Sequence, residues 1–348
     1  MSTYIKKIRT ASGDLQIDYN ALANLPTTDT DLTTSGKAAD AKVVGDKFNT
    51  MATKDYVDTT VSIFSNPNIL INGDFQVWQR GTSFSNIENT YSADRWLIKN
   101  AKAKTFKVEK STDVPSGQYM RQSVHLTETA EENTYLRYMF ENSLKGTFTL
   151  SFWYKTSTAF SAFYYDNGDT IHLGNLTALN TWTKATFVIN AVSMEWINVI
   201  HAMSSGDTYI TGVKLEYGNV ATVFVPRSYD EELLLCQRYF NTISGVRAIG
   251  VEHDKNAKTI TYVIPRNCIM RATPTVSVSG TTTTNSTDGI CVRNSNCALI
   301  SGFTFTYTIR NGELQVVAKN SGDVAENCYE TQLFVNDAFK FYLDAELY

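Results

Sequence analysis

The sequence is poor in charge and in the short patterns that mark enzymes. Only 19% of its 348 residues are charged, whereas about a quarter is usual in a soluble domain. Lys and Arg form no cluster, which argues against a nucleic-acid partner. GxSxG, P-loop and dinucleotide-binding motifs are missing, and the four histidines show neither HxxxH nor HxH spacing. The sequence therefore indicates no enzyme of these classes and no zinc or iron site built by local spacing.

Long apolar runs and CxxC pairs are missing as well. No segment approaches the roughly 18 apolar residues that a membrane span requires, so we expect no membrane insertion. The N-terminal stretch MSTYIKKIRT has no apolar core, which excludes a classical signal peptide. The five cysteines are an odd number without CxxC spacing. We therefore expect no disulfide framework and assembly in a reducing cytoplasm.

Aromatic residues are abundant instead, with 19 Tyr and 18 Phe, and such side chains suit half-buried pleated sheets. Residues 67–227 consist of short alternating runs separated by turns. The run 147–154 puts four apolar side chains on one face: Phe148, Leu150, Phe152 and Tyr154. Asn167-Gly168 and Asn311-Gly312 are hairpin signals. The sequence predicts a mainly β fold, with a jelly-roll β-sandwich over 67–227 and an antiparallel β-sandwich tip domain over 228–348.

A helix is predicted to open the C-terminal domain. Ser228 and Glu231 form a capping-box pattern, in which each side chain bonds the backbone N–H of the other residue. We expect the helix to run from Glu232 to about Asn241. Its predicted buried side chains are Leu233, Cys236, Tyr239 and Phe240.

The first 66 residues follow a different pattern. Residues 1–30 have weak periodicity and are interpreted as an attachment arm, with a frayed terminus as the alternative. Residues 31–66 carry a narrow apolar stripe at coiled-coil spacing. It consists of Val44, Phe48, Met51, Val57, Val61 and Phe64. Because so narrow a stripe is poorly stabilised within one chain, we expect a helical coiled-coil stalk that forms a homotrimer. The alternative is a helix folded back on the following domain.

Two kinds of site are compatible with these patterns, one for glycoside hydrolysis and one for sugar binding. Glycoside hydrolysis needs two carboxylates at a fixed separation. The neighbouring acidic pairs are Asp74 with Asp94, Asp166 with Asp169, and Glu131 with Glu132. The second pair flanks an Asn-Gly turn, where Asp is common because it bonds the local backbone. We therefore expect a protein that is not an enzyme.

Sugar binding needs less than hydrolysis: an aromatic platform for the apolar face of a pyranose, with a polar side chain beside it. Alternation puts Trp153 on the face opposite to its neighbours in the apolar run. Tyr165, beside Asp166, forms a second platform. Trp153, Tyr165 and Asp166 are therefore the candidate ligand-binding residues, with core packing as the alternative. The Thr-rich loop 280–287 is the second candidate region.

Several motifs together carry a family resemblance. They are NILINGDFQVWQRGTSF (68–84), YSADRW (91–96), GVKLEYG (212–218), PRSYDEEL (226–233) and LDAEL (343–347). With them the chain resembles bacteriophage tail-fibre and receptor-binding proteins. The part from NGDF to KLE-x-G resembles a carbohydrate-binding-module jelly roll. The stretches IDYNALANLP (17–26) and MATKDYVD (51–58) resemble fibre attachment and stalk segments.

The resemblance implies a homotrimeric tail fibre of a phage or phage-tail-like particle, assembled in the host cytoplasm and acting outside it in the virion tail. Its arm would dock on tail or baseplate proteins, and its β domains would bind a host surface glycan. The alternatives are a glycan-cleaving tailspike and a structural baseplate or collar subunit without a receptor. Related jelly rolls often hold a structural calcium through acids on the last strand. Here ITGVKLE (210–216) lacks the usual Asp pair, so no cofactor is expected. Asp207, just before this strand, leaves a structural calcium as the alternative.

Within these motifs, the stretch 68–84 is interpreted as scaffold. Phe75 and Val77 are expected to alternate along a strand and to face the core. Trp78 and Arg80 are expected to lock this strand to the segment 91–96. The glycines permit turns.

Overall fold

The computed structural model describes the following residues: 7–10, 13–16, 66–100, 106–129, 134–201, 203, 205–266, 268–280, 289–294, 296, 299–320 and 331–348. The chain divides into two units, 1–64 and 65–348. In the first unit, β1 (Lys7–Thr10) and β2 (Gly13–Gln16) pair as an antiparallel hairpin within the predicted arm. The six predicted stalk residues, Val44 to Phe64, and the Thr-rich positions 281–287 lie outside the described residues.

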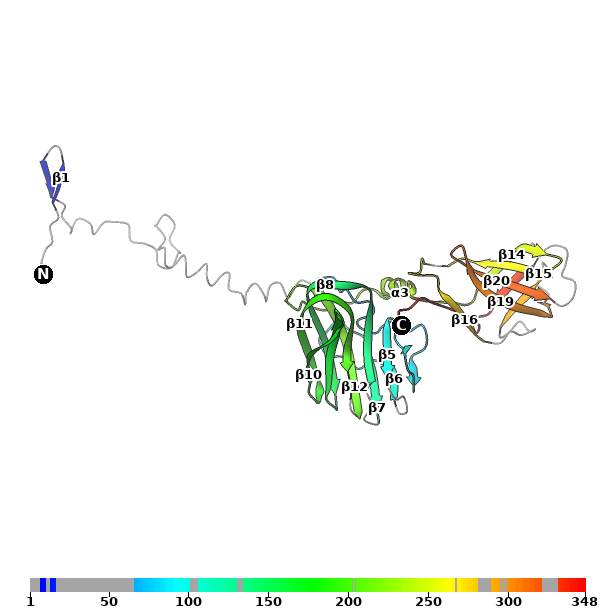
Figure 1. Ribbon diagram of the computed structural model, residues 1–348, viewed down its shortest axis with the longest axis horizontal. Coiled ribbons are helices and arrows are strands. Elements are labelled where there is room, and N and C mark those ends of the chain that lie inside the picture. The colour runs from blue at the N-terminus through cyan, green and yellow to red at the C-terminus, as the bar shows by residue number, and fades with distance from the viewer. Residues whose placement is uncertain are drawn as a thin grey trace. The chain divides into compact units, whose positions relative to one another are not determined.

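The second unit begins with a sheet of ten antiparallel strands (Figure 1). The strands are β3 (Ser83–Ser85), β4 (Thr90–Tyr91), β5 (Trp96–Asn100), β6 (Phe106–Ser111), β7 (Ser123–Glu128), β8 (Thr134–Thr156), β9 (Phe160–Asp166), β10 (Asp169–Leu176), β11 (Leu179–His201) and β12 (Gly206–Tyr217). Strands β8 and β11 are the longest, with 23 residues each.

The two long strands divide this sheet into two layers. The start of β8 pairs with β5 and with the end of β11, which in turn pairs with β9. The end of β8 pairs with the start of β11 and with β12, which continues to β7 and β6. The register of β11 shifts between Ala191 and Met194, where the strand passes from one layer to the other. One apolar core joins side chains of both layers, so this part of the chain is a β-sandwich, as predicted.

Local sequence signals account for much of this sandwich. The apolar run predicted to face one side is buried, with Phe148, Leu150 and Phe152 fully inaccessible. Asn167 and Gly168 have φ of 50° and 94°, the left-handed values that a tight two-residue hairpin needs. They connect β9 to β10, which confirms the hairpin prediction.

The C-terminal part is also antiparallel. Its elements are α3 (Tyr229–Gln237), β13 (Phe240–Ile243), β14 (Arg247–Asp254), β15 (Thr259–Ile264), β16 (Thr275–Ser279), β17 (Ile290–Arg293), β18 (Leu299–Ile300), β19 (Phe303–Arg310), β20 (Glu313–Asn320), β21 (Gln332–Val335) and β22 (Lys340–Asp344). They form sheets in the orders β13-β22-β16 and β18-β17-β21-β14-β15-β20-β19 around a second core. The turn at Asn311-Gly312 joins β19 to β20, again as predicted.

The helix α3 begins earlier and ends earlier than predicted. Ser228 is its N-cap, and its Oγ accepts a hydrogen bond from the Glu231 backbone at 3.3 Å, which confirms this half of the cap. Tyr239 and Phe240 are buried as expected, but they follow the helix. Phe240 is the first residue of β13 and pairs with Asp344 of β22, so it belongs to the sheet and not to the helix. No helix among the described residues combines the length and apolar character needed to cross a membrane.

The stretch after Asn68 is a turn, so the prediction of a strand through Phe75 and Val77 is wrong. Asn72 and Phe75 have φ of 59° and 55°, which interrupts any extended run. The Asn72 side chain closes the turn: it accepts from Val77 N at 3.0 Å and donates to Asp94 O at 2.9 Å. Gly73 is required there, because a Cβ would lie 2.2 Å from Val213 O. The scaffold interpretation holds, with a different backbone.

The predicted locking of this turn to the segment 91–96 is half correct. Arg80 forms an ion pair with Asp94 at 3.0 Å. Trp78 instead donates from Nε1 to Phe75 O at 2.6 Å and stacks on Phe84. The aromatic contact to Phe75 comes from Trp96, with ring centroids 5.0 Å apart.

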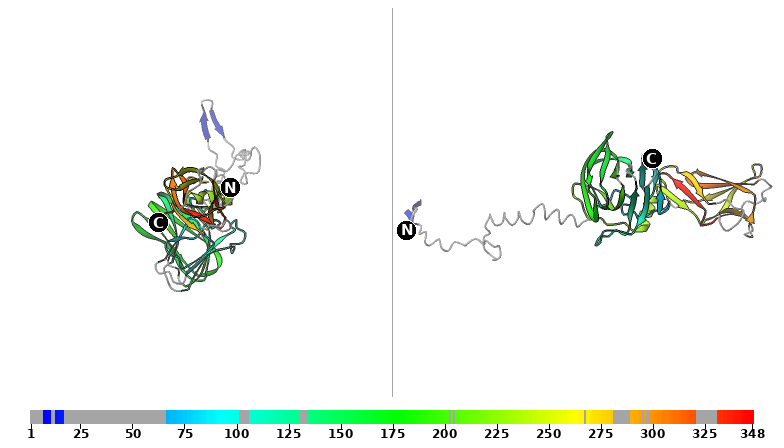
Figure 2. Two further views of the ribbon diagram at one scale, coloured as in Figure 1. Left: turned by 90° about the vertical axis from the view of Figure 1, so that its right-hand side faces the viewer. Right: turned by 90° about the horizontal axis from the view of Figure 1, so that it is seen from below.

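The C-terminus returns to the first sandwich, beside β5 (Figures 1 and 2). Glu346 is buried and accepts hydrogen bonds from Arg95 and from Arg80, the latter at 3.3 Å. The Tyr91 hydroxyl donates to Leu347 O, and the Tyr91 ring meets Tyr348 edge to face. The LDAEL motif therefore ties the chain end to the first sandwich.

Candidate functional site

A groove of about 430 Å³ lies on the outer face of the layer that contains β12. At its centre is Tyr209, which pairs in register with His125 of β7 and Lys155 of β8. The adjacent residues Tyr154 and Ile210 belong to the core, so alternation along the strands directs Tyr209 and Lys155 outward. The rest of the lining consists of Thr156, Ser157, Asn180 and Asp207.

Tyr209 stands between an imidazole and an ammonium group. The His125 ring stacks on it with centroids 4.1 Å apart and planes 2° apart. Lys155 Nζ lies 4.4 Å from the centroid of the same ring, a cation–π distance. Burial raises the pKa of the Tyr209 hydroxyl, so this group stays neutral. The three side chains thus form a ladder across β7, β12 and β8.

Trp182 of β11 extends the ladder and is held by Asp113. Its Nε1 donates to Asp113 Oδ1 at 3.0 Å, and Lys155 forms an ion pair with the other carboxylate oxygen. Burial pushes the pKa of Asp113 up, but the hydrogen bonds from Lys155 and Trp182 outweigh it, so the net pKa is lowered. The indole is therefore fixed by a charged acceptor.

At the other end of the groove, Asp207 holds His125. Its carboxylate accepts from His125 Nε2 at 2.8 Å and from Thr127 Oγ1 at 2.9 Å. The hydrogen bond from His125 is the main reason that the pKa of Asp207 is lowered. The side chain is 53% exposed, so the carboxylate is accessible to a ligand. Among the described residues, no group of three or more His, Cys, Asp or Glu is arranged to hold a metal.

The groove combines the two features that a hydroxylated ring compound requires. Tyr209 in the groove and Trp182 beside it offer apolar surface, whereas Lys155 and Asp207 in the lining and Asp113 beside it offer a donor and two acceptors at fixed positions. The volume lies within the range of about 300–1,000 Å³ that is usual for small-molecule sites. The arrangement suits binding of a sugar ring.

Trp153, the first predicted ligand-binding residue, lies on the same face as this groove. It is half-buried, two residues before Lys155 on β8, and it pairs with Thr211 of β12 and Lys184 of β11. Its neighbours Phe152 and Tyr154 are buried in the core, so the predicted alternation is confirmed. Trp153 adjoins the groove without being part of its lining.

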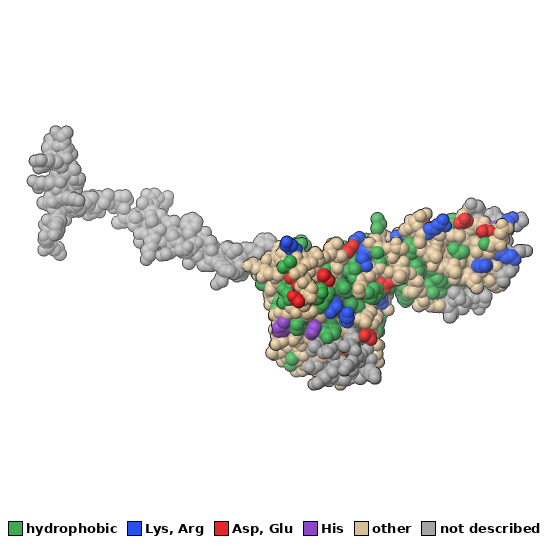
Figure 3. Space-filling model, viewed as in Figure 1, with side chains coloured by type: hydrophobic (Ala, Val, Ile, Leu, Met, Phe, Trp, Pro, Cys, Tyr) green, Lys and Arg blue, Asp and Glu red, His purple; other side chains and the backbone are tan. Residues whose placement is uncertain are grey.

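Tyr165, the second predicted residue, belongs to another cluster, in the layer that contains β9. Its ring stacks on Trp196 with centroids 5.2 Å apart and planes 10° apart. The Arg137 guanidinium lies 3.7 Å from the centroid of the Trp196 ring, and burial lowers its pKa to about 10. Histidine side chains are visible on the face of the first sandwich that Figure 3 shows, and the rings of His172 in β10 and His201 in β11 contact Phe163 in β9. The structure therefore places Tyr165 and Trp153 in two different surface clusters.

Asp166, the third predicted residue, is 5% exposed. Its carboxylate accepts from the backbone amides of Val192 at 3.0 Å and Ser193 at 2.5 Å, where β11 passes between the layers. These bonds hold the irregular part of β11, which is a structural task. A role for Asp166 in ligand binding stays a prediction.

The sequence did not predict the residues of the ladder in and beside the groove. Tyr209, His125 and Trp182 are far apart in sequence, and no motif connects them. The signal that would reveal them is the cross-strand register of β7, β12 and β8, which alternation within one strand does not contain. Asp113 lies in the connection after β6, where no periodicity applies.

No family model and no curated protein matches the chain. Among solved structures, it is similar to the enzymatically active domain of bacteriophage CBA120 tailspike protein 4, with 22% identity, 43% of this chain covered and a TM-score of 0.34. The match spans 21% of the tailspike chain, about a fifth of its length. A complex of TmCBM61 with β-1,4-galactotriose matches with 13% identity, 44% and 99% of the two chains and a TM-score of 0.32.

The xylan-binding domain CBM22-1 from Paenibacillus barcinonensis Xyn10C matches with 12% identity, 44% and 95% of the two chains and a TM-score of 0.29. The structural neighbours thus include a phage tailspike domain and several carbohydrate-binding modules.

Proposed function

We propose that the chain is the tail fibre of a phage or phage-tail-like particle and binds a host surface glycan through the groove around Tyr209. The observation that carries this proposal is the ladder of His125, Tyr209, Lys155 and Trp182, bounded by two carboxylates. A pyranose can lay its apolar face on the rings while its hydroxyls exchange hydrogen bonds with the charged groups. The groove is open, which fits an extended polysaccharide.

The predicted residues extend this proposal. Trp153 would lengthen the groove along β8, because it shares the outer face with Lys155. Tyr165, stacked on Trp196, would offer a second platform in the other layer. Weak contacts of this kind become effective when several copies act together, since each further contact forms at a high effective concentration.

The proposal includes a homotrimer whose arm docks on tail or baseplate proteins and whose stalk spans residues 31–66. Burying Phe48 and Val61 in a three-helix seam would contribute about 1.5–3 kcal/mol per side chain. Phe48→Asp combined with Val61→Asp should therefore weaken the trimer in sedimentation velocity. An unchanged trimer would show that the β domains hold the copies together.

The direct test of glycan binding uses the full chain on an array of bacterial surface polysaccharides. Trp182→Ala with Tyr209→Ala removes the ring inside the groove and the ring beside it. This double change should weaken binding by about tenfold or more, since each aromatic contact is worth roughly 1 kcal/mol or more. Tyr217→Ala is the matched control, because Tyr217 is a 65% exposed tyrosine on the same strand. Equal binding by the double variant and the control would overturn the proposal.

We propose a binding protein and not an enzyme. Two of the acids considered for hydrolysis are occupied: Asp94 is paired with Arg80, and Asp166 accepts backbone hydrogen bonds. Incubating the chain with a polysaccharide that it binds should release no new reducing ends. Their appearance would favour a glycan-cleaving tailspike, and binding to no glycan at all would favour a structural tail subunit.

A further inference from the structure

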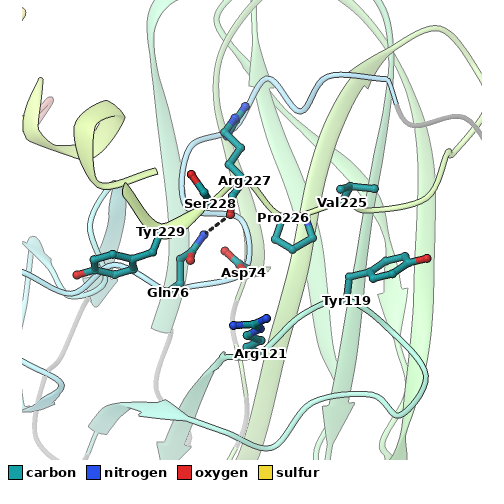
Figure 4. A pocket seen from close by; sticks show the side chains of 9 residues that line it. All are labelled: Asp74, Gln76, Tyr119, Arg121, Val225, Pro226, Arg227, Ser228 and Tyr229. Carbon is teal, nitrogen blue, oxygen red and sulfur yellow. Dashed lines mark hydrogen bonds between the residues drawn. The ribbon is translucent and has the colours of Figure 1, made fainter. Parts of the chain in front are cut away.

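A second pocket, of about 520 Å³, lies away from the groove, where the turn at 72–76 meets the segment that precedes α3 (Figure 4). Figure 4 shows Asp74 and Gln76 in its middle, Arg121 below them, Tyr229 on one side and Tyr119 on the other. These elements come from the NGDF turn, from the connection before β7 and from the start of the helix.

Asp74 is the unusual member of this pocket. It is 3% exposed, and burial is the main cause that raises its pKa to about 6, followed by the charge of Glu232. Backbone amides of the turn stabilise the carboxylate, but no described side chain forms an ion pair or hydrogen bond with it. The nearby Lys110 ammonium donates instead to Gln76 O at 2.8 Å. A buried carboxylate without a side-chain partner is costly unless a ligand supplies donors.

Arg121 offers the complementary chemistry. It lines the same pocket and makes no ion pair with Asp74 or with any other residue that the structure describes. Its guanidinium donates planar, paired hydrogen bonds. Asp74 can accept hydrogen bonds and Arg121 can donate them, and no bond joins the two across the pocket. A ligand with a donor next to an acceptor can therefore bind both side chains.

The other residues that line the pocket indicate which kind of ligand fits it. Tyr119 and Tyr229 are 63% and 52% exposed, and Val225 is 52% exposed. Gln76 Nε2 donates to Arg227 O at 3.2 Å, which fixes the amide within the lining. Arg227 also lines the pocket but is paired with Glu232 at 3.2 Å. Exposed aromatic and apolar surface around Asp74 and Arg121 favours a neutral ring bearing adjacent hydroxyls, which can donate to the carboxylate and accept from the guanidinium.

We propose that this pocket is a second sugar-binding site, in which neighbouring hydroxyls of one pyranose bridge Asp74 and Arg121 while its ring lies against a flanking tyrosine. The inference rests on the proposed function for its ligand class, but its residues are entirely separate from those of the groove. The pocket would then add a sugar site to the groove and to the platform at Tyr165, and a polysaccharide could engage more than one of them.

The test is saturation-transfer NMR of the full chain with the methyl glycosides of glucose, galactose, mannose and N-acetylglucosamine. At least one glycoside should bind to Trp182→Ala, and this remaining binding should weaken about tenfold in Trp182→Ala with Asp74→Asn, because a charged hydrogen bond is lost. Arg121→Gln should act like Asp74→Asn. Asp169→Asn, an exposed carboxylate outside both sites, is the control, and thermal melts verify that each variant is folded.

The outcomes separate the two proposals. If the wild type binds a glycoside and Trp182→Ala alone abolishes binding, the pocket inference is overturned and the groove stands. If Asp74→Asn abolishes binding while Trp182→Ala has no effect, the pocket stands and the groove is contradicted. If none of the four glycosides binds to the wild type, the pocket inference is overturned in the form given, and the polysaccharide array still decides the groove.

Discussion

The junction at the C-terminus and the groove around Tyr209 use similar residues in opposite ways. At the junction, Arg80, Arg95 and Glu346 form a charged network whose side chains are at most 11% exposed. In the groove, Lys155 and Asp207 keep 23% and 53% of their side-chain surface exposed. The charged groups at the junction are bonded to one another inside the protein, whereas those in the groove remain accessible to a ligand.

This difference explains why the most distinctive motifs say little about function. NGDF, YSADRW and LDAEL supply Asn72, Asp94 and Glu346, each buried and bonded within the scaffold. The KLE motif behaves alike: Lys214 pairs with Glu216 at 3.3 Å, and Glu216 accepts from Thr222 N at 2.8 Å. These motif residues therefore build the support, whereas Asp74 of NGDF lines the second pocket.

The largest expected effect comes from breaking the junction. Glu346→Ala would leave the Arg95 guanidinium, 1% exposed, without its buried partner. Removing one member of a buried pair costs about 3–5 kcal/mol. The free energy of unfolding from urea titration should fall by that amount, while Glu313→Ala at an exposed position should change little. A loss below about 1 kcal/mol for Glu346→Ala would show that the network contributes little.

A smaller effect, of opposite sign, is expected at Asp74. Its folded pKa of about 6 lies above the usual aspartate pKa of 3.8, so the favourable contribution of its protonated form is present below about pH 4 and is lost as the pH rises through 6. Asp74→Asn removes the charge and should stabilise the chain by about 3 kcal/mol at pH 7.5, and little at pH 4.

Urea titrations of Asp74→Asn at both pH values measure this directly. A variant that is less stable at pH 7.5 would mean that the carboxylate is well solvated or paired in the folded chain. Higher stability together with weaker sugar binding would mark Asp74 as a residue that trades stability for function.

The smallest effect is expected in the groove, at Asp207. The pKa of Asp207 is lowered mainly by the hydrogen bond from His125, so this contribution to stability is present above the unfolded pKa and is lost as the pH falls through the folded pKa. Because the carboxylate is more than half exposed, Asp207→Asn should cost at most about 0.5 kcal/mol at pH 7. Thermal melting should shift by only a few degrees or less. A large loss would place Asp207 in the scaffold and weaken the contrast with the junction.

The sequence predicted those features that local rules control. The alternation of Phe148 to Tyr154, the Asn-Gly turns and the Ser228 cap all depend on neighbours within a few residues, and all are confirmed. Alternation predicts a strand at Phe75, whereas the structure has a turn, because one of the Asn72 bonds that hold it reaches Asp94, 22 residues away. The stalk stays a prediction.

The candidate site depended on contacts that the sequence does not contain. Alternation along β8 predicts that Trp153 lies on an outer face, and the structure confirms this. The distance between Trp153 and Tyr165 depends instead on which half of β8 and of β11 belongs to which layer. His125 and Tyr209 stack because β7 and β12 pair in one register, and a shift of one residue would turn the Tyr209 ring toward the core.

The most direct test of the account is a crystal structure of the full chain bound to a polysaccharide fragment identified on the array. We predict a sugar ring against Trp182 and Tyr209, with hydroxyls within hydrogen-bonding distance of Lys155, Asp113 or Asp207. A sugar bound only on the Tyr165–Trp196 stack or on the C-terminal sandwich, with the groove empty, would contradict the central claim.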